Sequence, residues 1–339
     1  MDIGKQSQWM TNGDDPWDVF VCHVPADSQS RFYAGLPSRL PLTPEALSDV
    51  LNKKVSAYFD TLSHGAYRPI FRAAGEVTIA ATDEPQACVD SSLSADRGTA
   101  HGVIAIADAE HNFGEPGGFA NPGSACASPA CPASTTRRSA YVGAADFSPQ
   151  WEDNPPMDLV EHEIGHALDW PHSGLDVSQN DPEQSALDVM SNSAAPRDVQ
   201  PGRRDAPDTL AINRLSAGWL PMSAVTVVAA PGGTVELAPS TGQTGTRLAV
   251  IALDGHQFIT VELLTADGFD DHLPASGVAV HLIDGAGTSR TQTPLVGLAP
   301  HTDLLTPGET LTSNGWSVSV AAGWRVTIKP AGTVPTVSG

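Results

Sequence analysis

The chain has 339 residues, 40% of them hydrophobic, so it can bury one large core or two of moderate size. Its 18 basic and 39 acidic residues give a formal charge of −21, which disfavours nucleic acid and anionic membrane surfaces as partners. No stretch approaches the roughly 20 apolar residues that a membrane-spanning helix needs. We therefore expect a monomer that does not insert into membranes.

The first part of the chain predicts alternating helices and strands. Residues 1–16 are polar and lack periodicity, which indicates a loose leader, and residues 18–25 predict the first strand. Apolar residues recur at spacings of three and four over residues 43–62, which predicts an amphipathic helix with Thr43 as its N-cap. Residues 110–135 are rich in Gly, Pro, Ser and Ala and predict a long surface loop. Further strands are predicted at residues 77–81, 102–107 and 140–144.

A helix is predicted from Asn154 to Trp170, because the sequence is punctuated at both ends. Asn154 can act as its N-cap, and the prolines at 155 and 156 fall in the first turn, where no amide donor is needed. Pro171 ends it. This helix carries the residues with the clearest chemistry in the chain.

After a second predicted helix at residues 208–219, the pattern changes near residue 221 to short alternating segments between glycine-rich turns. These strands are predicted at residues 225–229, 248–253, 258–264, 278–283, 316–320 and 324–328. Their regular spacing predicts an all-β sandwich. The expected organisation is a leader at 1–16, an α/β domain with a mixed sheet at 17–221, a β-sandwich domain at 222–331 and a tail at 332–339.

Four cysteines, an even number, favour an oxidising compartment, although they allow three pairings. Cys126 and Cys131 bracket a short loop that a disulfide could close, which would pair Cys22 with Cys88; four reduced thiols are the alternative. The first 20 residues hold no apolar run that could form the core of a signal peptide. The chain therefore either lacks its leader or stays inside the cell, and the cysteines favour a secreted protein.

Residues 161–172, EHEIGHALDWPH, point to a zinc site. On a helix, His162 and His166 lie one turn apart and within about 40° of each other, so both imidazoles can bind one Zn²⁺. His172 follows the end of the helix and would be the third ligand, which leaves the fourth position for water. Glu163 lies about 100° around the helix from His162, close to the metal without being a ligand, and is the expected general base.

These residues and other polar residues of the chain also allow other interpretations. Asp169 lies on the histidine face one turn beyond His166 and is the alternative third ligand, and a purely structural histidine pair is a further alternative. Ca²⁺ is weakly suggested by two acidic groups, Asp108 with Glu110, and Asp267 with Asp270 and Asp271, but neither has EF-hand spacing. Four histidines without partners at ligand spacing are expected to be structural: His101, His111, His281 and His301.

HEIGHALDWPH followed by Asp188-Val189-Met190-Ser191 resembles the metzincin clan of zinc peptidases, which combine an extended zinc helix with a methionine turn below the metal. Met190 would supply that Met-turn. Residues 55–75 and 262–284 are similar to segments of secreted peptidases related to immune inhibitor A and gametolysin. The resemblance implies a metzincin-like α/β catalytic domain, secretion and protein substrates.

The sequence departs from the family at Asp169, where the family has a glycine that permits a left-handed backbone. Aspartate is one of the few other residues that adopt this conformation with modest strain. No tyrosine closely follows Met190, so no second group for the oxyanion can be named.

The leading expectation is a zinc metalloendopeptidase that acts on protein or peptide substrates. An edge strand would hold the substrate, and residues 102–107 or 140–144 are the expected location. The alternative is a non-catalytic zinc-containing protein whose β domain contacts a surface glycan or a protein. Glu163 argues against that alternative, because a structural zinc needs no base. A zinc hydrolase of non-peptide amides is a third possibility.

Overall fold

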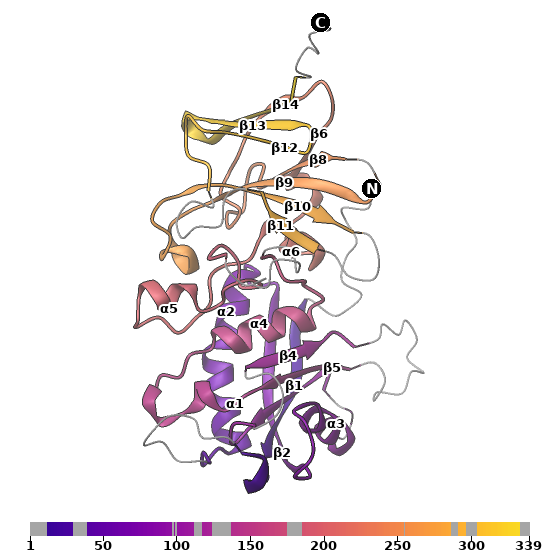
Figure 1. Cartoon of the computed structure of the whole chain (residues 1–339), viewed down its shortest axis with the longest axis vertical. Helices are drawn as coiled ribbons and strands as arrows, with labels where there is room; N and C mark the ends of the chain where they lie inside the picture. The colour runs from indigo at the N-terminus through magenta and orange to yellow at the C-terminus, as the bar shows by residue number, and fades with distance from the viewer. Residues whose placement is uncertain are drawn as a thin grey trace, which may run out of the picture.

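The computed structural model has a mixed α/β architecture with several sheets and few helices. Figure 1 shows one sheet with its helices at one end of an elongated molecule and β-sheets at the other. No helix in the described residues is both long enough and apolar enough to cross a membrane. The structure describes residues 12–29, 39–96, 98, 100–111, 117–123, 137–174, 185–253, 255–285, 291–295 and 304–332.

The N-terminal sheet has five strands in the order β2 (Tyr67–Thr78), β1 (Gly13–His23), β3 (Gly102–Ala107), β5 (Arg138–Val142) and β4 (Gly118–Asn121). β1 pairs in parallel with β2 and β3, and β3 pairs in parallel with β5. Strand β4, at the edge of this sheet, runs antiparallel to β5. Every residue of β3 and β5 is buried, as expected for strands of a parallel sheet that is covered on both faces.

The predicted leader is wrong over its last residues, because β1 begins at Gly13 and pairs there with Tyr67 of β2. Asp15 is fully buried, and its carboxylate accepts hydrogen bonds from Tyr67 Oη at 2.6 Å and Trp17 Nε1 at 3.0 Å and pairs with Arg138. A polar segment without periodicity therefore forms a strand because distant residues satisfy its polar groups. Residues 1–11 of the predicted leader lie outside the described residues.

The helix predicted at 43–62 is two helices, α1 (Pro44–Lys53) and α2 (Val55–Leu62), separated at Lys54. The Thr43 cap is confirmed, since its hydroxyl accepts a hydrogen bond from Ala46 N at 3.3 Å. The strand predicted at 77–81 is wrong except at its first two residues, because β2 ends at Thr78. Helix α3 (Gln86–Ala95) was not predicted.

A disulfide joins Cys22 of β1 to Cys88 of α3, with 5.6 Å between the Cα atoms, and confirms that predicted pairing. Cys126 and Cys131 lie outside the described residues. The predicted loop at 110–135 contains β4, so that prediction is wrong for residues 118–121.

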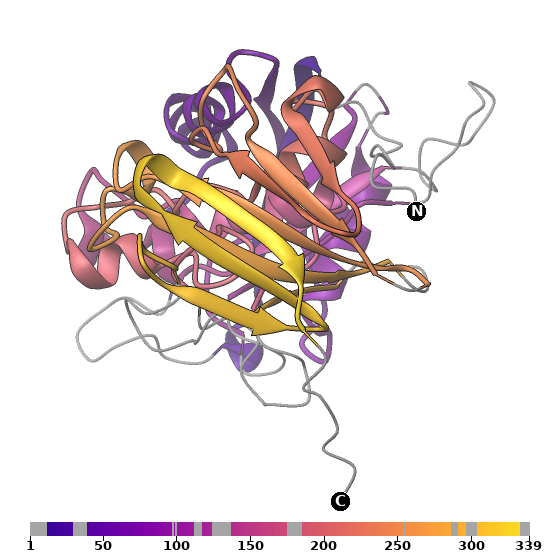
Figure 2. The same ribbon diagram turned by 90° about the horizontal axis from the view of Figure 1, so that it is seen from above.

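The C-terminal part forms two sheets. One has the order β11 (Thr291–Pro294), β10 (Gly277–Asp284), β9 (Gln257–Leu264), β8 (Leu248–Ala252), β6 (Val225–Val228), and the other β12 (Thr310–Ser313), β13 (Trp316–Ala321), β14 (Arg325–Pro330), β7 (Gly233–Glu236). Val261 and Val280 of one sheet share an apolar core with Val318 and Val326 of the other. Figure 2, seen from above, shows the two sheets one behind the other. Strands β7, β11 and β12, of four residues each, were not predicted.

Along the chain, the described residues between β5 and β6 form three further α-helices, α4 (Asp158–Ala167), α5 (Ala195–Val199) and α6 (Ala211–Ser216). The helix predicted at 208–219 is therefore shorter than expected. Ile212 and Leu215 of α6 share a buried cluster with Val250 and Phe258 of the C-terminal sheet. An apolar core thus crosses the boundary expected near residue 221.

Candidate metal centre

Helix α4 begins later than predicted, and its first turn uses no side-chain cap. The Asn154 cap is wrong: the Asn154 side chain instead accepts a hydrogen bond from Lys54 Nζ, and the two prolines precede the helix. Val160 and Ile164 bury one face of α4 in the apolar core. The histidines lie on another face.

The end of α4 redirects the chain toward the histidines. Asp169 has a φ of 67°, so it adopts the left-handed conformation that glycine accepts without strain. Asp169 N donates to His166 O at 2.9 Å and Trp170 N donates to Gly165 O at 3.1 Å, the paired hydrogen bonds of a Schellman motif. This turn ends the helix and brings His172 back over it.

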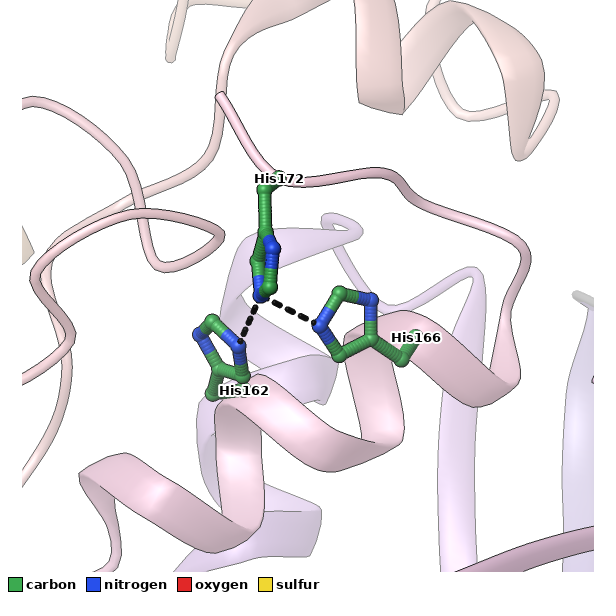
Figure 3. A group of neighbouring side chains, drawn as sticks. All are labelled: His162, His166 and His172. Atoms are coloured by element: carbon green, nitrogen blue, oxygen red, sulfur yellow. Dashed lines mark hydrogen bonds between the residues drawn. The ribbon is translucent and has the colours of Figure 1, made fainter. Parts of the chain in front are cut away.

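The three predicted histidine ligands converge. His172 Nε2 lies 3.2 Å from His162 Nε2 and 2.9 Å from His166 Nε2. Figure 3 shows the two helical imidazoles one turn apart, with His172 reaching them from the following loop. With zinc–nitrogen bonds of about 2.0–2.1 Å, tetrahedral coordination separates ligand nitrogens by about 3.3–3.4 Å. The described spacing is close to that separation, so small adjustments would fit one ion.

Backbone carbonyls orient two of the imidazoles. His162 Nδ1 donates to Val189 O at 2.6 Å, and His166 Nδ1 donates to Trp170 O at 2.8 Å. These bonds leave the Nε2 lone pair of each neutral ring directed at the cluster. Burial, together with the neighbouring histidines, lowers the pKa of His162 well below its ordinary value and that of His166 to about 4. Both rings are therefore neutral at pH 7, the form that binds metal.

Met190 lies fully buried directly against α4. A side chain at Gly165 would overlap the Met190 sulfur, so glycine is required where the helix and the turn meet. Ser173 N donates to Met190 O at 3.0 Å, and Ser191 N donates to Asp188 O at 2.9 Å. The residues after His172 are thus tied to a tight turn whose Val189 carbonyl also orients His162.

Asp188 anchors this turn, a role that sequence reasoning missed. Its buried carboxylate accepts hydrogen bonds from Thr209 Oγ1 at 3.0 Å and from Asn213 Nδ2 at 3.4 Å. Burial raises the pKa of Asp188 to about 6, although polar groups of Ser173 and Met190 oppose that shift. The sequence alone does not reveal this role of Asp188, because its hydrogen-bond donors, Thr209 and Asn213, lie more than twenty residues further along the chain.

Glu163 is 3% exposed and lies between α4 and β4. A Cβ atom added at Gly118 would lie 2.5 Å from Glu163 Oε1 and 2.7 Å from its Cγ. The Glu163 carboxylate therefore packs directly against the β4 backbone, and only a glycine at position 118 leaves room for it.

The two strands predicted as the edge that would hold a substrate are not edge strands, so that prediction is wrong. Residues 102–107 form β3, which β1 and β5 flank, and residues 138–142 form β5, which β3 and β4 flank. A strand with neighbours on both sides has no unpaired backbone for a peptide. The edge strand beside α4 is β4, which was predicted as part of a loop from its composition.

The remaining candidates do not assemble a second site. Within the described ranges, His162, His166 and His172 form the only group of three or more His, Cys, Asp or Glu side chains that could hold a metal. Neither acidic group considered for Ca²⁺ converges in this way, and Asp169 is exposed and does not belong to the cluster. Of the histidines expected to be structural, His101 is hydrogen-bonded to Asp15, His111 is hydrogen-bonded to Tyr141, and His281 is buried in β10. His301 lies outside the described residues.

Fold and site together define a protein with a mixed α/β part, a β-rich part and a three-histidine cluster that could bind a metal ion. No protein-family model matches the chain, and no curated protein matches it. Any narrower assignment therefore depends on the chemistry of the site.

Proposed function

We propose that this protein is a secreted zinc endopeptidase of the metzincin clan. The observation that carries the proposal is the convergence of three histidine Nε2 atoms at a helix in which the residue after His162, Glu163, is buried. The left-handed turn at Asp169 and the packing of Met190 under α4 also match the expected zinc-helix and Met-turn arrangement. The disulfide between Cys22 and Cys88 supports an oxidising compartment.

The donor set suits zinc, because neutral imidazoles are preferred zinc ligands whereas Ca²⁺ and Mg²⁺ prefer oxygen. His162, His166 and His172 would hold the ion. Zinc bound there would polarise the scissile carbonyl and lower the pKa of a water molecule to about 7. Glu163 would take a proton from the attacking water and later deliver it to the leaving amine.

Strand β4 is the proposed support for the substrate. It is an edge strand, and the outer side of an edge strand carries backbone groups that an extended peptide can pair with. Because Gly118 of β4 contacts Glu163, a peptide along this edge would pass close to the general base.

Two other functions remain as alternatives. One is a non-catalytic zinc-containing protein whose C-terminal sheets contact a glycan or a protein; the other is a zinc hydrolase that acts on a non-peptide amide. A buried Glu163 next to His162 in α4 favours catalysis over a structural metal, because a structural zinc needs no base.

The decisive experiment compares the wild type with Glu163→Gln on a generic unfolded protein substrate, with zinc content measured on both. We expect Glu163→Gln to keep about one zinc per chain and to lose at least about 100-fold in hydrolysis. Glu236→Gln, an exposed substitution in β7, is the matched control and should leave both quantities unchanged. Undiminished turnover in Glu163→Gln, or activity after complete removal of zinc, would exclude the proposed mechanism.

A further inference from the structure

A cavity of about 360 Å³ lies where α1 meets α2, away from the histidine cluster. The segment that leads into α4 and the loop at residues 202–205 complete its wall. Its basic lining residues are Lys53, Lys54, Arg203 and Arg204. Because the chain has only 18 basic residues against 39 acidic ones, four of them around one cavity depart clearly from its average charge.

Most of this positive charge is not neutralised. Arg203 pairs with Asp271, but none of the other three basic side chains has a carboxylate within ion-pair distance among the described residues. Lys54 Nζ donates to Asn154 Oδ1 and to Pro155 O. These neutral oxygens satisfy hydrogen bonds without cancelling the charge.

Arg204 is held in the same way. Its Nε donates to Asn154 O at 2.8 Å and its Nη1 donates to Pro201 O at 2.6 Å. Its guanidinium also lies 5.1 Å from the centre of the Trp151 ring. The guanidinium is therefore held beside the cavity by neutral groups, with no carboxylate within ion-pair distance among the described residues.

One acidic residue, Asp205, lines the same cavity, so the lining side chains carry four positive charges and one negative charge. Burial lowers the pKa of Lys54, and the charges of Arg204 and Lys53 add to that shift, although the carboxylates of Asp205 and Glu161 oppose it. The Tyr58 and Phe269 rings, whose centroids lie 4.6 Å apart, also line the cavity. The excess of positive over negative side chains in the lining favours an anion.

We propose that this cavity binds an oxyanion of the sulfate or phosphate class through Lys53, Lys54 and Arg204. Such an anion would connect the α1–α2 junction with the lead-in to α4. Arg204 O accepts the hydrogen bond of Met157 N at 2.7 Å, at the residue that precedes α4. Occupancy is therefore expected to stabilise the start of the helix that carries His162 and His166.

The test is isothermal titration of the full chain with sodium sulfate, at an ionic strength held constant with sodium chloride, and with acetate titrated in parallel. We expect one saturable sulfate site and weaker binding of acetate, which carries a single charge and presents fewer oxygens. Lys53→Gln should weaken sulfate binding about two- to fivefold, and Arg204→Gln about tenfold or more. Lys329→Gln, an exposed lysine in β14, is the matched control and should bind as the wild type does.

Lys53 is exposed and makes no side-chain hydrogen bond among the described residues, so its variant tests the site even if Arg204→Gln fails to fold. Sulfate binding that no titration detects above the chloride background would overturn the proposal. So would sulfate binding of equal strength in Lys53→Gln and Lys329→Gln, since it would place the anion elsewhere, the histidine cluster included.

Discussion

At the scale of single residues, the position of His172 depends on the backbone conformation of Asp169. A helix that continued past residue 168 would carry Asp169 toward the cluster; the left-handed turn instead exposes Asp169 and returns His172. We predict that His172→Ala weakens zinc binding by more than about 100-fold, because it removes one of three imidazoles. Competition against a zinc-selective chelator measures this affinity.

Asp169→Gly should keep the metal and change the free energy of unfolding by less than about 1 kcal/mol, because glycine accepts a positive φ but adds freedom to the unfolded chain. Urea denaturation measures this change. His256→Ala, which removes an exposed imidazole, is the control for His172→Ala and should leave zinc binding unchanged. Loss of zinc in Asp169→Gly with retention in His172→Ala would instead make Asp169 the third ligand.

At the scale of elements, the contact between α4 and β4 places the proposed base. We predict that Gly118→Ala lowers kcat/KM at least about tenfold while zinc stays bound, because the new methyl group displaces the Glu163 carboxylate. Gly118 does not adopt a left-handed φ, so the effect comes from this contact and not from backbone strain. Zinc content and steady-state kinetics on the same preparation separate the two quantities.

Gly233→Ala in β7, where an added Cβ meets nothing within 4 Å, is the control for the glycine-to-alanine change itself. If Gly118→Ala kept full activity, the contact between Glu163 and β4 would have no part in positioning the base.

At the scale of the whole molecule, buried carboxylates lie where α6 meets the C-terminal sheet. Glu262 of β9 accepts a hydrogen bond from Ala211 N at 2.8 Å, and burial raises the pKa of Glu262 to about 8. Arg214 lowers this pKa and Asp188 raises it. The folded protein therefore binds a proton at Glu262 that the unfolded chain releases near pH 4.5.

A raised carboxyl pKa makes the folded state less stable as pH rises from the unfolded value toward the folded one. We predict that the wild type loses stability relative to Glu262→Gln between about pH 4.5 and pH 8, because the glutamine side chain does not titrate. Urea midpoints of both proteins at pH 5, 6.5 and 8 give the comparison. A difference that stays constant across this range would mean that Glu262 is ionised in the folded protein.

Local chemistry determined the parts of this protein that short segments specify. The helical periodicity and the Thr43 cap placed α1, and β3 matched its predicted bounds. Alternation between turns predicted six of the nine strands that the structure describes in the C-terminal part. Histidine spacing predicted that His162 and His166 would meet, because one turn of a helix brings positions 162 and 166 to the same side.

Tertiary structure decided what depends on partners far along the chain. Gly13–Pro16 form a strand because β2 pairs with them, and the four-residue strand β4 has no pattern of its own until β5 pairs with it. Sequence reasoning therefore chose the wrong substrate edge and missed the anchoring role of Asp188. Such features depend on pairing between distant segments and on burial. Their free energies exceed those of local propensity, and the spacing of residues within one segment does not predict them.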